Sequence, residues 1–307
     1  MATQLVSLPE VERLSASVIR ILAGNPGKFT LQGTNTYLIG RGHQRILIDT
    51  GQGEPAWVNN LTSVLSSEKA TVHQALLTHW HGDHVGGVKD LLRLCPQASV
   101  YKCEPDEDDG QVGIVDGQVF SVEGATLKAV FSPGHTEDHM AFVLEEEDAI
   151  FTGDRMNDGN RANQGMTIDV LGHGTAVFEN LKTYVSSLHR MRDRVQGRGY
   201  PGHGAVMENV NIRISEYIKH RKQREDEVAR VLRWGKLDVS PGERSPEPKR
   251  SWTPLQLVKV IYKDVPENLH LPASHGIGLV LHKLEDEGRV VHDSESGEWR
   301  LSEKSAL

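Results

Sequence analysis

The sequence has no long hydrophobic run, since no stretch approaches the roughly 18 apolar residues that a membrane span requires. Its first twenty residues show neither the apolar core of a secretory signal nor the acid-free pattern of a transit peptide, because Glu10 and Glu12 interrupt them. Cysteine is scarce as well, and Cys95 and Cys103 are too few for a disulfide framework. We therefore expect a cytoplasmic protein without a membrane partner.

The chain also has no excess of positive charge. Its 307 residues include 34 Lys and Arg against 42 Asp and Glu, a formal net charge of −8 at pH 7. Surfaces that bind nucleic acid or anionic membranes without sequence preference are usually basic. The charge therefore argues against nucleic acid as the main partner. Hydrophobic residues make up 37% of the chain, which suffices for a core at this length.

Short apolar runs alternate with amphipathic stretches over the first three quarters of the chain. The apolar runs are rich in β-branched and aliphatic residues, whereas the amphipathic stretches carry an apolar residue every three or four positions. This alternation predicts an α/β fold, with sheets covered by helices. The expected strands cover 36–39, 45–49, 73–78, 99–102, 117–132, 140–153 and 195–200, and the expected helices cover 54–67, 87–94, 175–192 and 210–233.

The composition changes after residue 235. Residues 236–251 are rich in Pro, Ser and mixed charges, which is typical of a linker. Beyond them the pattern predicts a helix that begins at Thr253-Pro254, a second helix through Ile277 and Leu284, and a hairpin over 289–301. This order is that of a small winged-helix-like module. We predict a catalytic domain over 1–235, a linker over 236–251 and a winged-helix-like domain over 252–307.

The most informative string is Thr78-His79-Trp80-His81-Gly82-Asp83-His84, which directly follows an apolar run. Imidazole and carboxylate groups are preferred ligands of Zn²⁺. On extended backbone the rings of His79 and His81 reach one metal, while Asp83 and His84 turn toward a neighbouring one, as in two-metal sites. Surface histidines in a polar loop are the competing interpretation, which the rarity of this string by chance disfavours.

Three further residues follow apolar runs elsewhere in the chain. His135 lies in Ser132-Pro-Gly-His-Thr136, Asp154 follows Phe151-Thr-Gly153, and His203 lies in Tyr200-Pro-Gly-His-Gly204. Taken singly, each fits an ordinary turn or a helix cap. Taken together, they supply one more imidazole for each metal and a carboxylate that could bridge both.

With these residues the chain resembles the metallo-β-lactamase superfamily over roughly residues 15–235. The strings Gly24-Asn-Pro-Gly27 and Leu31-Gln-Gly-Thr-Asn-Thr-Tyr37 resemble its β-lactamase-like protein 2 and glyoxalase II-like group, and above all the fungal atrochrysone carboxyl ACP thioesterases. The resemblance implies an αββα sandwich of two sheets between outer helices, with two Zn²⁺ per chain. It implies these metal contacts: His79, His81 and His135 on the first zinc, Asp83, His84 and His203 on the second, and Asp154 between them.

The resemblance further implies a thioesterase that releases a polyketide acid from the acyl carrier protein domain of a non-reducing polyketide synthase. We expect Asp83 to be the catalytic residue, which orients the attacking water and takes its proton. A thiolate, with a thiol pKa near 8.5, leaves without a strong acid. His139 and His173 are expected beside the site, either touching substrate or orienting a ligand.

Other interpretations remain open. A single-strand endoribonuclease of the β-lactamase-like protein 2 type is one alternative function, and a non-catalytic protein acting through the winged-helix-like end is another. The basic run at 220–224 could receive an acidic carrier protein, or it could be a solvated helix face. Residues 155–169 look inserted relative to the resembling proteins, and they could be a substrate-covering loop, a passive excursion or a retained intron.

Overall fold

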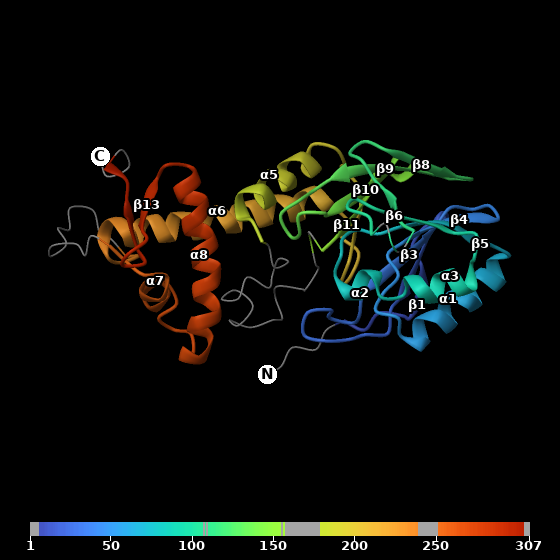
Figure 1. Cartoon of the computed structure of the whole chain (residues 1–307), viewed down its shortest axis with the longest axis horizontal. Coiled ribbons are helices and arrows are strands. Elements are labelled where there is room, and N and C mark those ends of the chain that lie inside the picture. Colours follow the sequence, from blue (N-terminus) through green and yellow to red (C-terminus); the bar gives the residue numbers. More distant parts are fainter. Residues whose placement is uncertain are drawn as a thin grey trace.

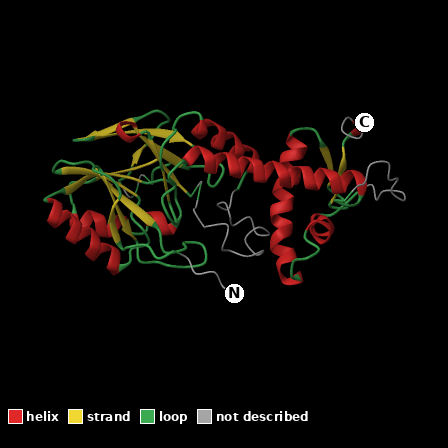
Figure 2. Ribbon diagram, turned by 180° about the vertical axis from the view of Figure 1, so that it is seen from behind, coloured by secondary structure: helices red, strands yellow, loops and turns green. Residues whose placement is uncertain are grey.

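The structure is a computed structural model, and it describes residues 6–106, 108, 110–154, 156, 179–238 and 251–303. Within these residues, two β-sheets face one another and carry helices on their outer sides. A smaller unit with helices and a short hairpin extends from one end along helix α6 (Figures 1 and 2). No described helix combines the length and the apolar character needed to cross a membrane.

The first described sheet has seven strands in chain order, from β1 at one edge to β7 at the other. Strands β1 to β4 are antiparallel to their neighbours, whereas β4 to β7 are parallel. Parallel neighbours need crossover connections, which α1 supplies between β4 and β5 and α3 between β5 and β6. The elements are β1 (Val11–Arg13), β2 (Val18–Leu22), β3 (Asn35–Ile39), β4 (Gln44–Ile48), α1 (Pro55–Glu68), β5 (Thr71–Leu76), α2 (Gly82–Val85), α3 (Val88–Leu94), β6 (Ser99–Lys102) and β7 (Val112–Gly113).

The second described sheet has five strands in the order β12-β11-β10-β9-β8. Its hairpin-connected strands are antiparallel, and β11 and β12 are parallel. Helices α5 and α6 lie on its outer side (Figure 1). The elements are β8 (Val119–Val122), β9 (Ala125–Phe131), β10 (Met140–Leu144), the 3₁₀ turn η1 (Glu145–Glu147), β11 (Ala149–Gly153), α5 (Leu181–Arg192), β12 (Gly199–Pro201) and α6 (Val210–Trp234).

Alternating side chains give each sheet two buried faces. Tyr37 and Phe151 meet edge to face between the sheets, with ring centroids 5.1 Å apart. On the outer face of the first sheet Leu47 packs in one apolar cluster with Trp57 of α1, and Tyr184 of α5 belongs to the cluster outside the second sheet. Burial of apolar surface on both faces holds the four layers together. The predicted αββα sandwich is therefore confirmed.

The C-terminal unit consists of two main helices and a hairpin. Its first helix begins with a capping box, in which Thr253 and Gln256 each bond the other's backbone N–H. The order helix, helix, hairpin agrees with the prediction. The elements are α7 (Pro254–Ile261), the 3₁₀ turn η2 (Glu267–Leu269), α8 (His270–Asp286), β13 (Val290–Asp293) and β14 (Glu298–Leu301).

Helix α6 joins this unit to the sandwich. Its residue Val231 lies in the same apolar cluster as Leu257 of α7 and Leu281 of α8. Glu225 of α6 also forms a buried ion pair with Lys283 of α8, with 2.8 Å between carboxylate and ammonium. The C-terminal unit therefore packs directly on a helix of the sandwich. The domain boundaries at 235 and 251 stay predictions, and most of the predicted linker, residues 239–250, lies outside the described residues.

Several element predictions are confirmed, and some are wrong. The runs at 36–39, 45–49, 73–78 and 99–102 correspond to β3, β4, β5 and β6. The strand expected over 195–200 begins only at Gly199, and the helix expected from 175 is described only from Leu181. The sequence did not reveal β1 and β2, because Arg20 interrupts the apolar pattern of β2. In the structure Arg20 is buried and paired with Glu12 of β1.

Candidate metal centre

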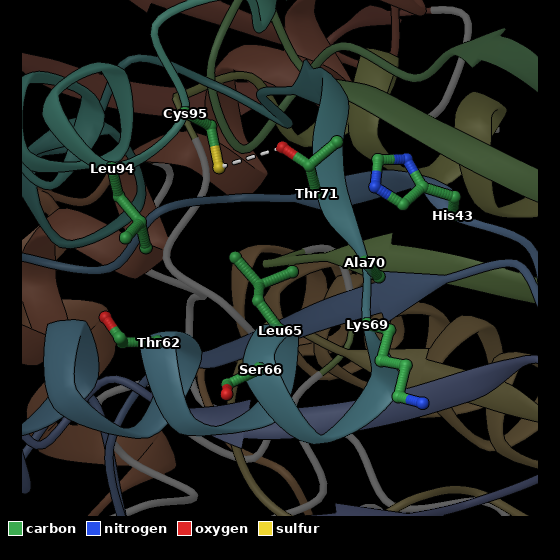
Figure 3. A pocket seen from close by; sticks show the side chains of 9 residues that line it. All are labelled: His43, Thr62, Leu65, Ser66, Lys69, Ala70, Thr71, Leu94 and Cys95. Carbon is green, nitrogen blue, oxygen red and sulfur yellow. Dashed lines mark hydrogen bonds between the residues drawn. The ribbon is translucent and has the colours of Figure 1, made fainter.

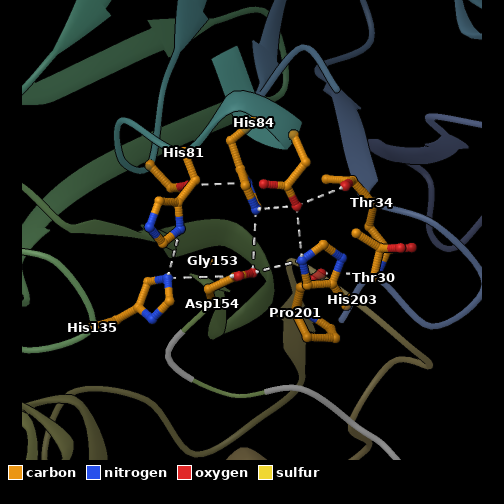
Figure 4. Close-up of polar contacts among 12 residues, drawn as sticks. Thr30, Thr34, His81, His84, His135, Gly153, Asp154, Pro201 and His203 are labelled. Atoms are coloured by element: carbon orange, nitrogen blue, oxygen red, sulfur yellow. Dashed lines mark hydrogen bonds and ion pairs between the residues drawn. The ribbon is translucent and has the colours of Figure 1, made fainter. Parts of the chain in front are cut away.

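The predicted metal ligands lie where strands of both sheets end. His79 comes three residues after β5, and His135 comes four residues after β9. Asp154 directly follows β11, and His203 comes two residues after β12. The facing sheets therefore bring residues that are far apart in the chain to one edge of the sandwich (Figure 4).

The first group of ligand atoms is a triangle of ring nitrogens. Nε2 of His79 lies 2.9 Å from Nδ1 of His81, and Nε2 of His135 lies 3.3 Å and 3.1 Å from these two atoms. A tetrahedral zinc with Zn–N bonds of 2.0–2.1 Å holds its nitrogens about 3.3 Å apart. The triangle therefore has the dimensions of three ligands on one ion.

The second group is built on the short helix α2, which carries Asp83 and His84. Oδ2 of Asp83 lies 3.4 Å from Nε2 of His84 and 3.2 Å from Nε2 of His203. The loop with His203 approaches so closely that a Cβ at Gly202 would lie 2.3 Å from Oδ1 of Asp154. Glycine before His203 is thus required by the packing of this group.

Asp154 links the two groups through its two oxygens. Oδ1 lies 3.3 Å from Nε2 of His84 and 3.2 Å from Nε2 of His203, whereas Oδ2 lies 3.7 Å from Nε2 of His135. In each group of four residues, the possible ligand atoms all lie within 4.8 Å of one another. The arrangement gives Asp154 the position of a bridge.

The donor atoms fit a divalent metal. Nε2 of His84 and Oδ1 of Asp154 are buried, and neither makes a hydrogen bond within the described part of the chain, although they lie 3.3 Å apart. Buried polar atoms without a hydrogen bond are costly. Coordination of a shared cation by both atoms removes that cost. The two groups therefore indicate a divalent metal centre.

The charges of the two groups favour a cation as well. Burial opposes protonation of His84, but the carboxylates of Asp154 and Asp49 outweigh it and hold the pKa of His84 well above its usual value. Burial is likewise outweighed at His203, where Asp154 raises the pKa to about 9. In the first group, burial and then the charge of His84 hold the pKa of His79 well below its usual value. A bound metal supplies the positive charge that the carboxylates attract and releases these protons.

A buried carboxylate that the sequence analysis missed supports both groups. Oδ2 of Asp49 lies 2.7 Å from Nδ1 of His84, and Oδ1 accepts a 2.8 Å hydrogen bond from the backbone N–H of Thr78. The hydroxyl of Thr78 in turn lies 3.0 Å from Nδ1 of His79. A carboxylate behind a metal-binding histidine fixes its ring and tautomer. The position of Asp49 at the end of β4, parallel to β5, was the available signal.

Replacement of Asp49 by Asn is expected to weaken metal binding at the second group by about 10–100-fold, as is typical when an outer partner of a ligand is lost. Asn tolerates the left-handed backbone at this position, where φ is +57°. Titration of the metal-free protein with Zn²⁺ against a competing chelator measures the effect. Asp90→Asn, which changes a half-buried carboxylate paired with the exposed Arg93, is the matched control. Equal metal affinities in both variants would contradict the role of Asp49.

Comparison with known proteins places this fold and site in a family. The sequence model described as the Metallo-beta-lactamase superfamily matches residues 29–102, and the one described as the Beta-lactamase associated winged helix domain matches residues 253–299. A lactamase-like protein of Pestalotiopsis fici is 45% identical over 95% of this chain and 87% of its own length. The chain belongs to the metallo-β-lactamase superfamily. The C-terminal winged-helix prediction is also confirmed.

Other members of the superfamily extend the comparison. A protein of Aspergillus chevalieri named atrochrysone carboxyl ACP thioesterase is 43% identical over 96% of this chain and 89% of its own length. The crystal structure of a Burkholderia ambifaria β-lactamase domain protein matches with a TM-score of 0.70 at 16% identity, over 97% of this chain and 95% of that one. The predicted resemblance to fungal relatives of this kind is confirmed, and the solved structure supports the fold.

The structure describes some of the other residues named in the sequence analysis and leaves others undescribed. The seven-residue ligand assignment stays a prediction, now with the geometry above. His139 is fully buried, its Nδ1 lies 2.9 Å from the hydroxyl of Ser132, and its ring stacks on His79. This favours an orienting role over contact with substrate. His173 lies outside the described residues, as does the proposed insertion 155–169 apart from the buried Met156.

The basic run at 220–224 is not an open basic face. Arg221 is buried, Lys222 pairs with Asp226, and Arg224 pairs with Glu227. The guanidinium of Arg224 also lies over the ring of Tyr262, with 5.0 Å to the centroid. Lys222 and Arg224 are therefore already paired with groups of the same molecule. Of the two interpretations of this run, the contacts favour a helix face whose charges are paired within the molecule over a docking face for an acidic partner.

A separate hollow lies at the other end of β5 (Figure 3). It has a volume of about 490 Å³ and lies between α1, α3 and the start of β5. The hydroxyl of Thr71 contacts the sulfur of Cys95 at 3.5 Å, and Lys69 and His43 lie at its rim. None of its lining residues belongs to the two metal groups. The hollow therefore takes no part in the metal centre.

Proposed function

We propose that this protein is a zinc-dependent thioesterase that hydrolyses a polyketide bound to an acyl carrier protein and releases the free acid. We propose two zinc ions per chain, held by the two groups that share Asp154. A polyketide synthase with an acyl carrier protein domain is the proposed partner, since the A. chevalieri relative is named a carboxyl ACP thioesterase. Relatives of this kind cover nearly the whole chain.

The observation that carries the proposal is the carboxylate of Asp154 between two compact groups of ligand atoms. A pair of divalent ions, when bound, activates water near neutral pH and stabilises negative charge on the oxygen of the attacked carbonyl. These are the two requirements of thioester hydrolysis. A site with only one group of metal ligands would stabilise the negative charge on the carbonyl oxygen less.

The residues of the chain hold and orient the reactants. The contacts of Asp83 with Thr34, His84 and His203 all use Oδ2. We propose that Oδ1 of Asp83 accepts the proton of the attacking water, since its side chain is 23% exposed and can face the substrate. The acyl–sulfur bond then breaks with the electron pair on sulfur.

The proposed mechanism assigns no residue as a general acid, and this favours a thioester over RNA as the substrate, because the two differ in their leaving groups. A thiol has a pKa near 8.5, so it leaves as a thiolate without prior protonation. A ribose oxygen is a much stronger base and needs more help from an acid or a metal.

A direct comparison of substrates tests the proposal. The purified protein is given a synthetic aryl-polyketide thioester and a labelled single-stranded RNA, each with and without a chelator. We expect thiol release that the chelator abolishes and intact RNA, and metal analysis is expected to find two zinc ions per chain. Prompt RNA cutting with an inert thioester would overturn the proposal in favour of an endoribonuclease.

Replacement of Trp80 by Ala is expected to raise KM for an aryl thioester about tenfold with little change in kcat, because a lost aromatic contact costs about 1 kcal/mol or more. Trp80 lies between two predicted ligands, its ring is 4.5 Å from that of His81, and it is 54% exposed. Steady-state kinetics measure the change. A short acetyl thioester serves as the control substrate, and an equal loss on both thioesters would contradict binding of the aryl group by Trp80.

A further inference from the structure

The hydroxyl of Thr34 contacts Asp83 from behind the second group. Thr34 is fully buried and directly precedes β3, and its Oγ1 lies 3.3 Å from Oδ2 of Asp83. Its backbone forms an isolated β-bridge with His203. Thr34 thus lies beside two predicted ligands of the second group without being a predicted ligand itself.

Asn25 determines the direction of the Thr34 hydroxyl. The backbone N–H of Thr34 can only donate, and it donates to Oδ1 of Asn25 at 2.8 Å. This bond places Nδ2 of Asn25 toward Oγ1 of Thr34, where it donates at 3.0 Å. Because the hydroxyl accepts from Asn25, its own proton is available for the carboxylate of Asp83.

Asp83 needs such a support. It lies on α2, a helix of four residues, which is too short to be a rigid scaffold by itself. Its side chain is 23% exposed, whereas the other three residues of its group are almost fully buried. Within the described residues, its remaining contacts are to His84 and His203, which are predicted ligands of the same ion. A hydrogen bond from the fixed Thr34 hydroxyl is therefore the contact that can hold Asp83 independently of the metal.

We propose that Thr34, oriented by Asn25, is a positioning residue that fixes the carboxylate of Asp83 and thereby sets the metal affinity of the second group. The affinity of the first group, built from His79, His81 and His135, does not depend on this hydrogen bond. The inference rests on the two-metal part of the proposed function and is independent of which substrate the enzyme hydrolyses.

The test uses Thr34→Val, which keeps the branched shape and removes the hydroxyl. Metal-free protein is titrated with Zn²⁺ against a competing chelator. We expect one of the two equivalents to lose about 10–100-fold in affinity and the other to remain unchanged. Thr34→Ser restores a hydroxyl and is expected to restore most of the affinity. Asn25→Ala, which frees the hydroxyl to rotate, is expected to give a smaller loss.

Thr36→Val is the matched control. Thr36 is also buried, on β3, and its hydroxyl donates to the carbonyl of Ile21 at 2.8 Å and accepts from Nε1 of Trp57 at 2.9 Å, away from both groups. We expect this variant to lower the melting temperature and leave both metal affinities unchanged. Circular dichroism of each metal-free variant verifies folding.

The outcomes separate this proposal from the proposed function. Unchanged binding in Thr34→Val, an equal loss at both equivalents, or the same loss in Thr36→Val would overturn the positioning role, and so would a wild-type protein that binds a single equivalent. A wild-type protein that binds two equivalents but leaves the thioester intact would refute the thioesterase proposal and leave the role of Thr34 standing.

Discussion

Replacement of Asp154 by Asn is expected to abolish thioester hydrolysis, with a fall in kcat of roughly three orders of magnitude or more, and to weaken both metal equivalents. Loss of a single donor to the developing charge already lowers kcat by about 100–1000-fold in enzymes of known mechanism. Asp154 is expected to exceed that, because its two oxygens face both groups. An amide carries no negative charge, and its nitrogen cannot bind a metal in place of an oxygen.

Metal content and kinetics together verify this expectation. Mass spectrometry of protein purified without added metal should show fewer than two ions per chain in Asp154→Asn. Asp226→Asn, which changes an exposed carboxylate paired with Lys222 on α6, is the control and should retain both ions and full activity. A variant Asp154→Asn that keeps two tightly bound ions would refute the bridging position.

Replacement of Asp83 by Ala is expected to have the second large effect, a loss of the second metal equivalent and a fall in kcat/KM of about 1000-fold. Asp83 contributes Oδ2 to the second group and is the proposed acceptor of the proton from water. The variant removes both contributions at once. Unchanged turnover in Asp83→Ala would remove the basis of the proposed mechanism.

A second variant separates the two contributions of Asp83. Asp83→Asn keeps an oxygen that can bind a metal but cannot accept a proton at neutral pH. If Asp83 acts as the proton acceptor, kcat should fall in Asp83→Asn while the metal content stays closer to two. If Asp83 acts only as a ligand, the activity of the two variants should follow their metal content.

Much of the site could be predicted because its ligands are marked locally. The string from Thr78 to His84 places four candidate ligands within a few residues, and the Pro-Gly-His turns at His135 and His203 follow apolar runs. The structure brings these segments together at one edge of the sandwich. Strand ends that carry His and Asp after buried runs are thus informative without any tertiary model.

The supporting residues could not be predicted in the same way. Thr34 and Asn25 lie in a loop some fifty residues before Asp83, and their hydrogen bonds depend on how that loop packs against α2. The basic run at 220–224 is a second case, because the sequence left two interpretations of it open. Its charges look available in the sequence, whereas in the structure Arg221 is buried and the guanidinium of Arg224 lies over the ring of Tyr262.

Residue types and their spacing were sufficient to predict which atoms could bind a metal and in which order helices and strands alternate. Ligand type and hydrophobic period are local properties, so they survive without knowledge of the fold. Three contacts became visible only in the folded chain: Asp154 faces both groups, Asp49 lies behind His84, and Thr34 reaches Asp83. Such contacts join residues distant in the chain, and their distances are set by the packing of two sheets.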